Sequence, residues 1–362
     1  MSDNAQATNI SRAAPTALFV LLTGLFLLSF GGGSSRADGG EIPGATSATG
    51  ATAAVADASS VDAAAKKRAY AGPPRFTLAA KGSHRYRGRN YILPRTLLEI
   101  RGTVGADLDG QIVTLLINRN GRKIKSDRVR LTTRGGKSSF RVRFRAKKKG
   151  KHVFRVSLTD AQQALANAGS GVGVTAVRTN IRRGQSGVAI RVFQQRLAAL
   201  KYVVPTNGKY DAATARAFMA FRKNNFMSRR ESAGKAVAKK LAAGKGGFKL
   251  RHPKAGRHVE VSIKRQVMVF ADKGRVLRIY HVSTGAPSTP TIRGTYRVYR
   301  KDFGTNAKGM VHSAYFIRGY AIHGFASVPN FNASHGCVRV PIPNAVSIFN
   351  WINMGTRIDT YY

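Results

Sequence analysis

Acidic residues are scarce in this chain: its 362 residues include 61 Lys and Arg but only 16 Asp and Glu, a formal net charge of +45 at pH 7. So large an excess of one sign exceeds what solubility requires and predicts a polyanionic neighbour. Nucleic acid, lipid headgroups and anionic wall polymers would all attract the chain by the same salt-dependent physics. The compartment in which the protein works therefore decides among them.

Cysteine is nearly absent as well, since Cys337 is the single one. One cysteine cannot form a disulfide within the chain, so stability has to come from packing. The sequence also lacks an internal repeat, a second long apolar run, and a glycine-rich loop in the strand-to-helix context that holds phosphates. Nucleotide chemistry is therefore not indicated, and the lone thiol calls for a chemical explanation.

The N-terminal residues predict export. Arg12 precedes the apolar run 17–30 (ALFVLLTGLFLLSF), and small residues such as Ser35 and Ala37 follow it. This order is typical of a secretory signal and its cleavage site. A retained anchor is the alternative for 1–37, because the run is only slightly shorter than the ~17 to 25 residues that span a bilayer. We expect a secreted, cell-wall-associated protein that meets the membrane only through such an anchor, and no nucleic acid partner.

Two modules are expected next. Residues 38–74 are dominated by Ala, Gly, Ser and Thr, which cannot bury enough surface to offset their ordering entropy, so they predict a disordered linker. At 75–180 apolar residues recur at every second position, as in 140–145, which indicates half-buried strands. Hairpin turns are predicted at Asn120-Gly121 and at 147–151. We therefore expect an antiparallel, immunoglobulin-like β-sandwich without a catalytic constellation.

The apolar period becomes helical between 181 and 228, where Ile190, Phe193 and Leu197 recur at steps of three and four. Short helices on either side of an Asn207-Gly208 turn are expected. The module resembles the small helical peptidoglycan-binding domain through Gly184, Gly187, Phe193, Gln194, Leu197, Leu200, Tyr202, Gly208, Thr214, Ala217 and Phe221.

That resemblance implies binding to peptidoglycan glycan. The sequence departs from the family's pattern at Lys201 and Asp211, where glycine is usual, and at Arg222, where glutamine is usual. An amphipathic helical spacer without a ligand is the alternative.

The last third of the chain predicts a linker and then a third folded part. Residues 229–256 are basic and rich in Ala and Gly, so we expect a linker with one short helix near 236–241. At 257–362 short β-type runs return at 259–261, 267–270, 276–280 and 295–299, with one late helix at 344–352. The fold class is therefore multidomain: an N-terminal antiparallel β-sandwich, a small α-helical module and a C-terminal mostly-β domain.

One dense chemical cluster lies in this last domain. His323 and Gly324 precede the run 334–340 (SHGCVRV), and Cys337 follows His323 by 14 positions. A thiol with an ordinary pKa of ~8.5 is only a few per cent thiolate at neutral pH, so a nucleophilic cysteine needs an imidazole or another positive influence beside it. We prefer His323 to His335 as the base, because a strand-like approach fixes its ring.

The glycines next to these residues also have a physical use. Gly336 lets backbone N–H groups turn towards a developing oxyanion, and Gly324 exposes a carbonyl that can orient a histidine ring. Zinc is a rival interpretation of His323, His335 and Cys337, with His312 or His281 as a fourth ligand. A packed, inert thiol is a second rival, which the polar neighbours Ser334 and Arg339 disfavour.

The cluster resembles the signature of the L,D-transpeptidase catalytic domain, also called the YkuD domain, over 257–362. Upstream, 282–285 (VSTG), 289–291 (TPT) and 294–296 (GTY) resemble other stretches of that family in order and spacing. Val340 stands where leucine or methionine is common, and Ile292 where a second proline is often found.

The resemblance implies that Cys337 attacks the carbonyl between residues three and four of a wall tetrapeptide. The attack releases D-alanine and leaves a thioester, which the amine of a second stem then resolves. His323 would move the protons, the Gly324 carbonyl would orient its ring, and N–H groups near Cys337 would hold the oxyanion. Ser334, His335 and Arg339 would shape the pocket. Arg339 could bind a substrate carboxylate or, as we slightly favour, pair with an internal one.

No metal or organic cofactor is implied, and the expected partners are peptidoglycan stem peptides and glycan, anionic wall polymers, and carbapenem-type β-lactams as inhibitors that acylate Cys337. Hydrolysis of the same thioester would make the protein an L,D-carboxypeptidase. From a different class, a non-catalytic wall-binding protein would use the helical module and the charge. If the protein is instead a polyanion or nucleic-acid binder, its binding would persist without Cys337 but would be lost at high salt.

Overall fold

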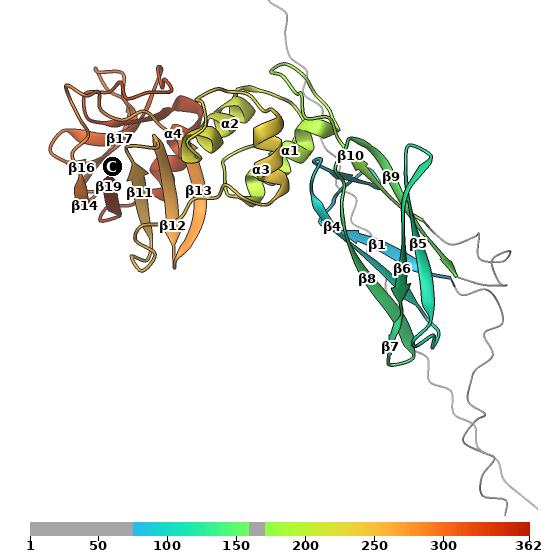
Figure 1. The fold of residues 1–362 in the computed structure, drawn as a ribbon. Coiled ribbons are helices and arrows are strands. Elements are labelled where there is room, and N and C mark those ends of the chain that lie inside the picture. The colour runs from blue at the N-terminus through green and yellow to red at the C-terminus, as the bar shows by residue number, and fades with distance from the viewer. Residues whose placement is uncertain (1–74, 159–170) are drawn as a thin grey trace, which may run out of the picture. The chain divides into compact units, whose positions relative to one another are not determined.

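The structure is a computed structural model that describes residues 75–158 and 171–362 (Figure 1). The predicted signal peptide or anchor at 1–37 and the linker at 38–74 lie outside the described residues. Within the described part of the chain, four sheets and four helices are formed, and strands predominate. No helix there is long and apolar enough to cross a membrane.

Two sheets make up the N-terminal part. Their strands are β1 (Thr77–Lys81), β2 (His84–Tyr86), β3 (Arg89–Ile92), β4 (Leu97–Val104), β5 (Ile112–Arg119), β6 (Arg122–Arg130), β7 (Thr132–Arg134), β8 (Lys137–Arg145), β9 (Gly150–Leu158) and β10 (Val172–Ala176). One sheet has the order β1-β4-β8-β7 and the other β2-β3-β10-β9-β5-β6. Alternate residues of both sheets, among them Ile100, Leu115 and Phe154, are buried in one apolar cluster. The predicted period-two strands are thus confirmed.

Two hairpin turns were predicted in this part, and the structure confirms one of them. The Asn120-Gly121 hairpin is confirmed: it joins β5 to β6, and both residues have positive φ, 48° and 85°, as a type I′ turn requires. The hairpin predicted at 147–151 is wrong, because β8 and β9 belong to different sheets. The apolar side chains of both strands face one core from opposite sides, and the rings of Phe144 and Phe154 meet edge to face at 5.3 Å.

The sequence predicted that these two sheets are antiparallel throughout, but they are not. β3 pairs with β10 in parallel, with Asn90 opposite Val174 and Ile92 opposite Ala176. A parallel pair needs a long connection between its strands, and the strands from β4 to β9 supply it. The immunoglobulin-like character of this part stays a prediction.

Three helices follow: α1 (Val188–Ala199), α2 (Ala212–Asn224) and α3 (Lys235–Ala242). The Asp211 side chain caps α2 by accepting from the Thr214 N–H at 2.8 Å. Phe193, Phe218 and Leu241, one from each helix, are fully buried in a common cluster. The stretch 229–256, expected to be mainly a linker, contains α3 and buries residues in that same cluster.

The C-terminal part contains two further sheets. Its elements are β11 (His258–Ser262), β12 (Val267–Asp272), β13 (Arg275–His281), β14 (Gly294–Arg297), β15 (Arg300–Thr305), β16 (Val311–Ile317), β17 (Tyr320–Phe325), β18 (Val338–Pro341), α4 (Ile342–Trp351) and β19 (Arg357–Tyr361). The orders are β13-β12-β11-β19-β14 and β15-β16-β17-β18. The strand predicted at 295–299 ends at Arg297, and the next strand, β15, joins the other sheet.

The helices and the first of these sheets are packed together. Val267 and Val269 of β12 and Ile279 of β13 are buried in the cluster that the three helices form. The backbone joins as well, since the Ile279 N–H donates to the Lys201 carbonyl at 2.8 Å. The helical module α1–α3 and the C-terminal sheets therefore share one apolar core.

A buried carboxylate, Glu260 of β11, ties the preceding loop and the last strand to this sheet. Its oxygens accept from the backbone N–H groups of Arg251 and His252 at 3.0 and 2.7 Å and from the Tyr361 hydroxyl at 2.5 Å, and the His258 ring lies 3.3 Å away. Burial alone raises the pKa of Glu260, but these hydrogen bonds outweigh it and lower the pKa to about 2.

We expect Glu260 to make stability depend on acid. Because its folded pKa is lowered, its contribution is present above the unfolded pKa of about 4.3 and is lost as the pH falls towards 2. Between pH 5 and 2 the wild type should lose roughly 3 kcal/mol more unfolding free energy than Glu260→Gln, measured by denaturant titration. The exposed Glu231→Gln is the control, and equal slopes in the wild type and Glu260→Gln would refute this account.

Candidate active site

Cys337 stands immediately before β18, at the end of the loop that leaves β17. The side chain is half-buried against Met310, Tyr315 and Ala321. Its Sγ accepts from the Ala321 N–H at 3.4 Å and lies 3.7 Å from the Gly319 carbonyl, to which a thiol can donate. The sulfur is thus held at the start of β17 in its protonated form.

The turn before Cys337 is built from short polar contacts. Ser334 Oγ donates to the Cys337 carbonyl at 2.5 Å and accepts from the Gly336 N–H at 3.2 Å. Gly336 has a φ of 106°, and a Cβ at this position would lie 1.8 Å from Cε1 of Tyr320. Only glycine fits both the left-handed backbone and the close ring. The sequence thus forces the chain into a turn that presents the thiol.

His323 lies on β17, and only 3% of its surface is exposed. Its Nδ1 is 2.9 Å from the Gly324 carbonyl, so Nδ1 carries the proton and Nε2 has a free lone pair. β17 and β18 are parallel neighbours, with Ile322 opposite Val338. Because alternate residues of a strand share a face, the His323 ring is on the same face as the side chain of Ala321, in the cluster against which Cys337 packs.

Burial sets the protonation state of the pair. It raises the pKa of the Cys337 thiol, although the Ala321 N–H and the positive charges of Arg339 and Lys308 oppose this rise. Burial also lowers the pKa of His323, against the hydrogen bond to Gly324 and together with the charge of Arg339. The thiol and the imidazole are therefore both neutral at rest, and a neutral imidazole can act as a general base.

The other predicted site residues described next, Gly324, Ser334 and His335, differ in what surrounds them. A Cβ on Gly324 would lie 2.7 Å from Cβ of Ala345 on α4, so glycine there also permits close helix packing. The Ser334 hydroxyl is buried and engaged within the loop, whereas the His335 side chain is exposed.

Arg339 corrects an expectation. Its guanidinium lies over the Phe325 ring at 4.2 Å, and none of the ion pairs among the described residues includes it. The internal carboxylate pair that the sequence slightly favoured is not formed among the described residues. With 16 acidic residues in the whole chain, such a partner is hard to supply.

A set of threonines supports the loop, and the sequence reasoning assigned them no role. Thr291 Oγ1 donates to the Gly336 carbonyl at 2.7 Å, and Thr289 Oγ1 donates to the Ser334 carbonyl at 3.0 Å. The Thr284 carbonyl accepts the N–H groups of both Ala333 and Ser334. These threonines belong to the stretches at 282–285 and 289–291 that were noted as motifs, so the signal was present although its structural use was not evident.

The ligands of the rival zinc site do not come together. His281 contacts Lys223 and the Val328 carbonyl, and His312 accepts from the Gly304 N–H at 3.0 Å. Across 75–158 and 171–362, no group of three or more His, Cys, Asp or Glu side chains could hold a metal ion.

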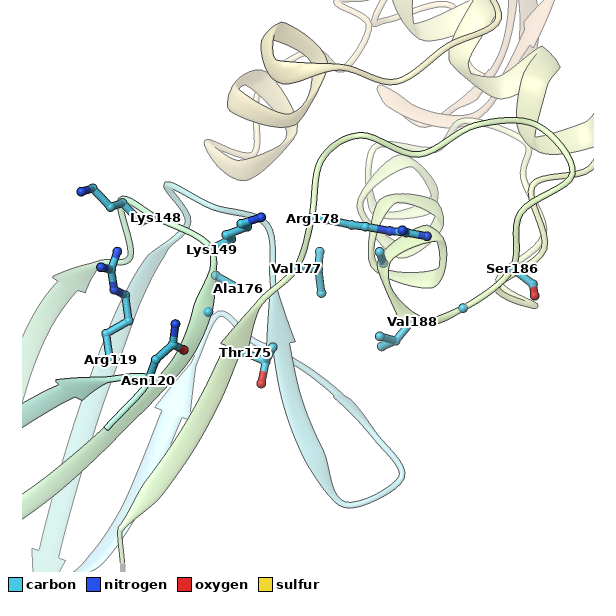
Figure 2. Close-up of a pocket in the computed structure, with 13 residues that line it drawn as sticks. Arg119, Asn120, Lys148, Lys149, Thr175, Ala176, Val177, Arg178, Ser186 and Val188 are labelled. Carbon is cyan, nitrogen blue, oxygen red and sulfur yellow. The ribbon is translucent and has the colours of Figure 1, made fainter. Parts of the chain in front are cut away.

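A hollow of about 680 Å³ lies apart from these residues, between the ends of β5 and β10 and the start of α1 (Figure 2). Arg119, Lys148, Lys149 and Arg178 line it, together with asparagine and small or apolar residues. It contains cations but no thiol, histidine or carboxylate, so it is suited to holding an anion and not to the chemistry that Cys337 and His323 can perform.

Replacing Gly336 should destabilise the site directly. We expect Gly336→Ala to cost about 2 kcal/mol or more of unfolding free energy, from the positive φ and from the contact with Tyr320. The double variant Gly336→Ala with Tyr320→Ala should recover the steric part alone. Gly319→Ala is the matched control, because no atom lies within 4 Å of its added Cβ. Equal melting temperatures for Gly336→Ala and Gly319→Ala would refute the account.

Comparison with known proteins gives a consistent result. Residues 256–359 match the family model of the YkuD domain, described as the L,D-transpeptidase catalytic domain. The chain is 31% identical to a solved L,D-transpeptidase from Xylanimonas cellulosilytica, over 51% of this chain and 98% of that one, with a TM-score of 0.47. No curated protein matches it.

Two further structures are more distant. An L,D-transpeptidase from Stackebrandtia nassauensis is 19% identical, over 51% of this chain and 96% of that one, with a TM-score of 0.33. The catalytic domain of the E. faecium L,D-transpeptidase acylated by ertapenem is 23% identical, over 29% of this chain and 97% of that one, with a TM-score of 0.25. The assignment of residues 256–359 therefore rests on the family model.

Proposed function

Because the chain belongs to the L,D-transpeptidase family with the YkuD catalytic domain, we propose that it crosslinks peptidoglycan with Cys337 as nucleophile and His323 as general base. One observation carries this assignment. Cys337 packs against the cluster that contains the Ala321 side chain, on the strand face from which His323 projects, and the Gly324 carbonyl fixes the proton on His323 Nδ1. Nε2 is thereby left to take the thiol proton.

The first half-reaction forms a thioester. Cys337 Sγ attacks the carbonyl carbon of the third residue of a tetrapeptide stem, and the S–H proton moves to His323 Nε2. The tetrahedral intermediate collapses with cleavage of the C–N bond to D-alanine, whose amine takes the proton from the imidazolium. A neutral resting pair suits this sequence, because His323 can accept a proton only when it begins without one.

The second half-reaction reverses the roles. The amine of an acceptor stem attacks the thioester carbonyl, His323 takes the amine's proton, and the C–S bond breaks. The released sulfur recovers the proton, so that the enzyme returns to its starting state. No metal or organic cofactor takes part in this scheme. Hydrolysis would follow the same path with water in place of the amine.

The loop provides oxyanion donors and a recognition surface in this proposal. The Gly336 N–H is already used by Ser334 Oγ, so the N–H groups of Cys337 and His335 are the donors that we assign to the oxyanion. Arg339, without an acidic partner among the described residues, would attract a stem carboxylate beside the thiol. The exposed His335 would contact the stem from the other side.

The remaining partners follow from charge and from the N-terminal sequence. A net charge of +45 and cationic surfaces such as the hollow in Figure 2 would hold the protein near anionic wall polymers. Export, with or without a retained anchor, and glycan binding by the helical module stay predictions. Acylation of Cys337 by carbapenem-type β-lactams belongs to the same proposal.

The function is tested with the full chain, a tetrapeptide stem donor and an excess of amine acceptor, analysed by mass spectrometry. We expect the wild type to release D-alanine and join the acceptor, and Cys337→Ala to do neither. His323→Ala should lower the rate by about 100- to 10,000-fold, whereas His335→Ala should change it far less.

The other outcomes are equally informative. Hydrolysed tripeptide without the joined product would make the protein an L,D-carboxypeptidase. No D-alanine release by folded wild type would contradict the proposal and favour a wall-binding role. Loss of activity in His335→Ala, with His323→Ala active, would move the base assignment to His335.

The neutral pair predicts a characteristic pH dependence. Because the pKa of His323 is lowered, the acidic limb of kcat/KM should have its midpoint below pH 6.5. Alkylation of Cys337 by iodoacetamide in His323→Ala should report the raised thiol pKa, with a midpoint above pH 9. A thiolate–imidazolium pair would instead give rapid alkylation of the wild type at pH 5, and that result would exclude the neutral pair.

A further inference from the structure

The loop that leads to Cys337 is held by its carbonyl groups. In the 328–331 segment, each of four consecutive carbonyls accepts a hydrogen bond from a side chain outside the loop. The donors are His281 Nε2 to Val328 at 3.0 Å, Lys223 Nζ to Pro329 at 3.5 Å, Arg229 Nη1 to Asn330 at 2.8 Å, and Ser283 Oγ to Phe331 at 2.6 Å. Two of the donors, Lys223 and Arg229, come from α2 and the residues that follow it.

Lys223 is the least expected of them. It lies in the last turn of α2, only 2% of its surface is exposed, and no carboxylate pairs with it among the described residues. Besides Pro329, its Nζ contacts His281 Nδ1 at 2.9 Å and the Val282 carbonyl at 2.8 Å. Burial, together with the charge of Arg229, lowers the pKa of Lys223 to about 6, so at pH 7 the amino group is largely neutral and shares its two N–H donors among these three acceptors.

His281 extends this contact. It is 7% exposed, and burial together with the charge of Lys223 lowers its pKa to about 3, so the ring is neutral. A neutral ring has one donor and one acceptor, and the geometry assigns both: Nδ1 accepts from Lys223 and Nε2 donates to Val328. The His281 side chain therefore links Lys223 of α2 to the Val328 carbonyl of the loop.

Lys223 contacts both of the segments that support the active-site loop. The Val282 carbonyl, which Lys223 binds, opens the stretch whose backbone pairs with Arg339 and whose Thr284 carbonyl holds Ala333 and Ser334. The Pro329 carbonyl lies in the loop itself, shortly before Ser334. One amino group thus joins the two segments that hold the Cys337 turn.

We propose that Lys223 is a positioning residue through which the helical module holds the loop of Cys337 in its reactive geometry. This inference rests on the proposed transpeptidase function of that site. It gives α1–α3 a role in catalysis that does not depend on binding glycan. Burying a lysine amino group without a carboxylate partner is costly, so an apolar residue would serve better at this position if the contact only packed the helix against the loop.

The test compares full-chain variants in the acceptor-joining assay. Lys223→Met keeps the length of the side chain and removes the amino group with all its hydrogen bonds, and we expect kcat to fall at least tenfold while KM for the donor changes less than twofold. Lys223→Arg, which keeps donors, should recover part of the rate. Lys239→Met, an exposed lysine of α3, is the matched control and should behave as the wild type.

A second variant and a second readout keep the test decisive. Arg229→Met removes one loop contact from a half-buried position and should lower kcat less than Lys223→Met does. Amide hydrogen exchange of 328–337, which needs no turnover, should show lost protection at Ala333 and Ser334 in Lys223→Met, or in Arg229→Met if the former does not fold.

The outcomes separate the two proposals. Folded Lys223→Met and Arg229→Met that turn over and exchange like Lys239→Met would overturn the positioning role while leaving the transpeptidase function intact. A wild type without turnover would contradict the function, and the exchange data would still support or overturn the role of Lys223.

Discussion

The site depends on hydrogen bonds made to the backbone of an irregular loop. In the loop between Phe325, where β17 ends, and Val338, where β18 begins, the carbonyl groups of 328–331 bind no neighbouring strand. Side chains take the place of that strand. Because each carbonyl of the 328–331 segment is bound separately, the loop keeps one path, and the Gly336 turn ends with the thiol at Ala321.

This arrangement fits the electrostatics of the chain. Negative charge is scarce, so the buried amino group of Lys223 meets carbonyl groups and a neutral imidazole instead of a carboxylate, and burial lowers its pKa to about 6. The same scarcity leaves Arg339 over an aromatic ring, where it remains available to an anionic substrate. Two carboxylates, Glu260 and Asp359, are buried. Glu260 joins the loop before β11 to the last strand, and Asp359 pairs with Arg357 on that strand.

Local patterns allowed much of this to be predicted from the sequence. The Asn120-Gly121 hairpin, the helices near 188–199 and 212–224 and the His323 and Cys337 neighbourhood all depend on residues close together in the chain. The β8 to β9 connection could not be predicted, because period two marks a buried face but not the sheet to which a strand belongs. Lys223 was missed for a similar reason, since its partners lie 58 to 106 positions away in the sequence.

The central claim is that the Cys337 sulfur carries the acyl group between donor and acceptor. Its most direct test is acid-quenched mass spectrometry and peptide mapping of the full chain incubated with the tetrapeptide donor in the absence of acceptor. The account predicts a mass gain equal to the donor minus D-alanine, located on Cys337 and released when acceptor is added before the quench. Joined product formed by an enzyme that never gains this mass, or an adduct on another residue, would contradict it.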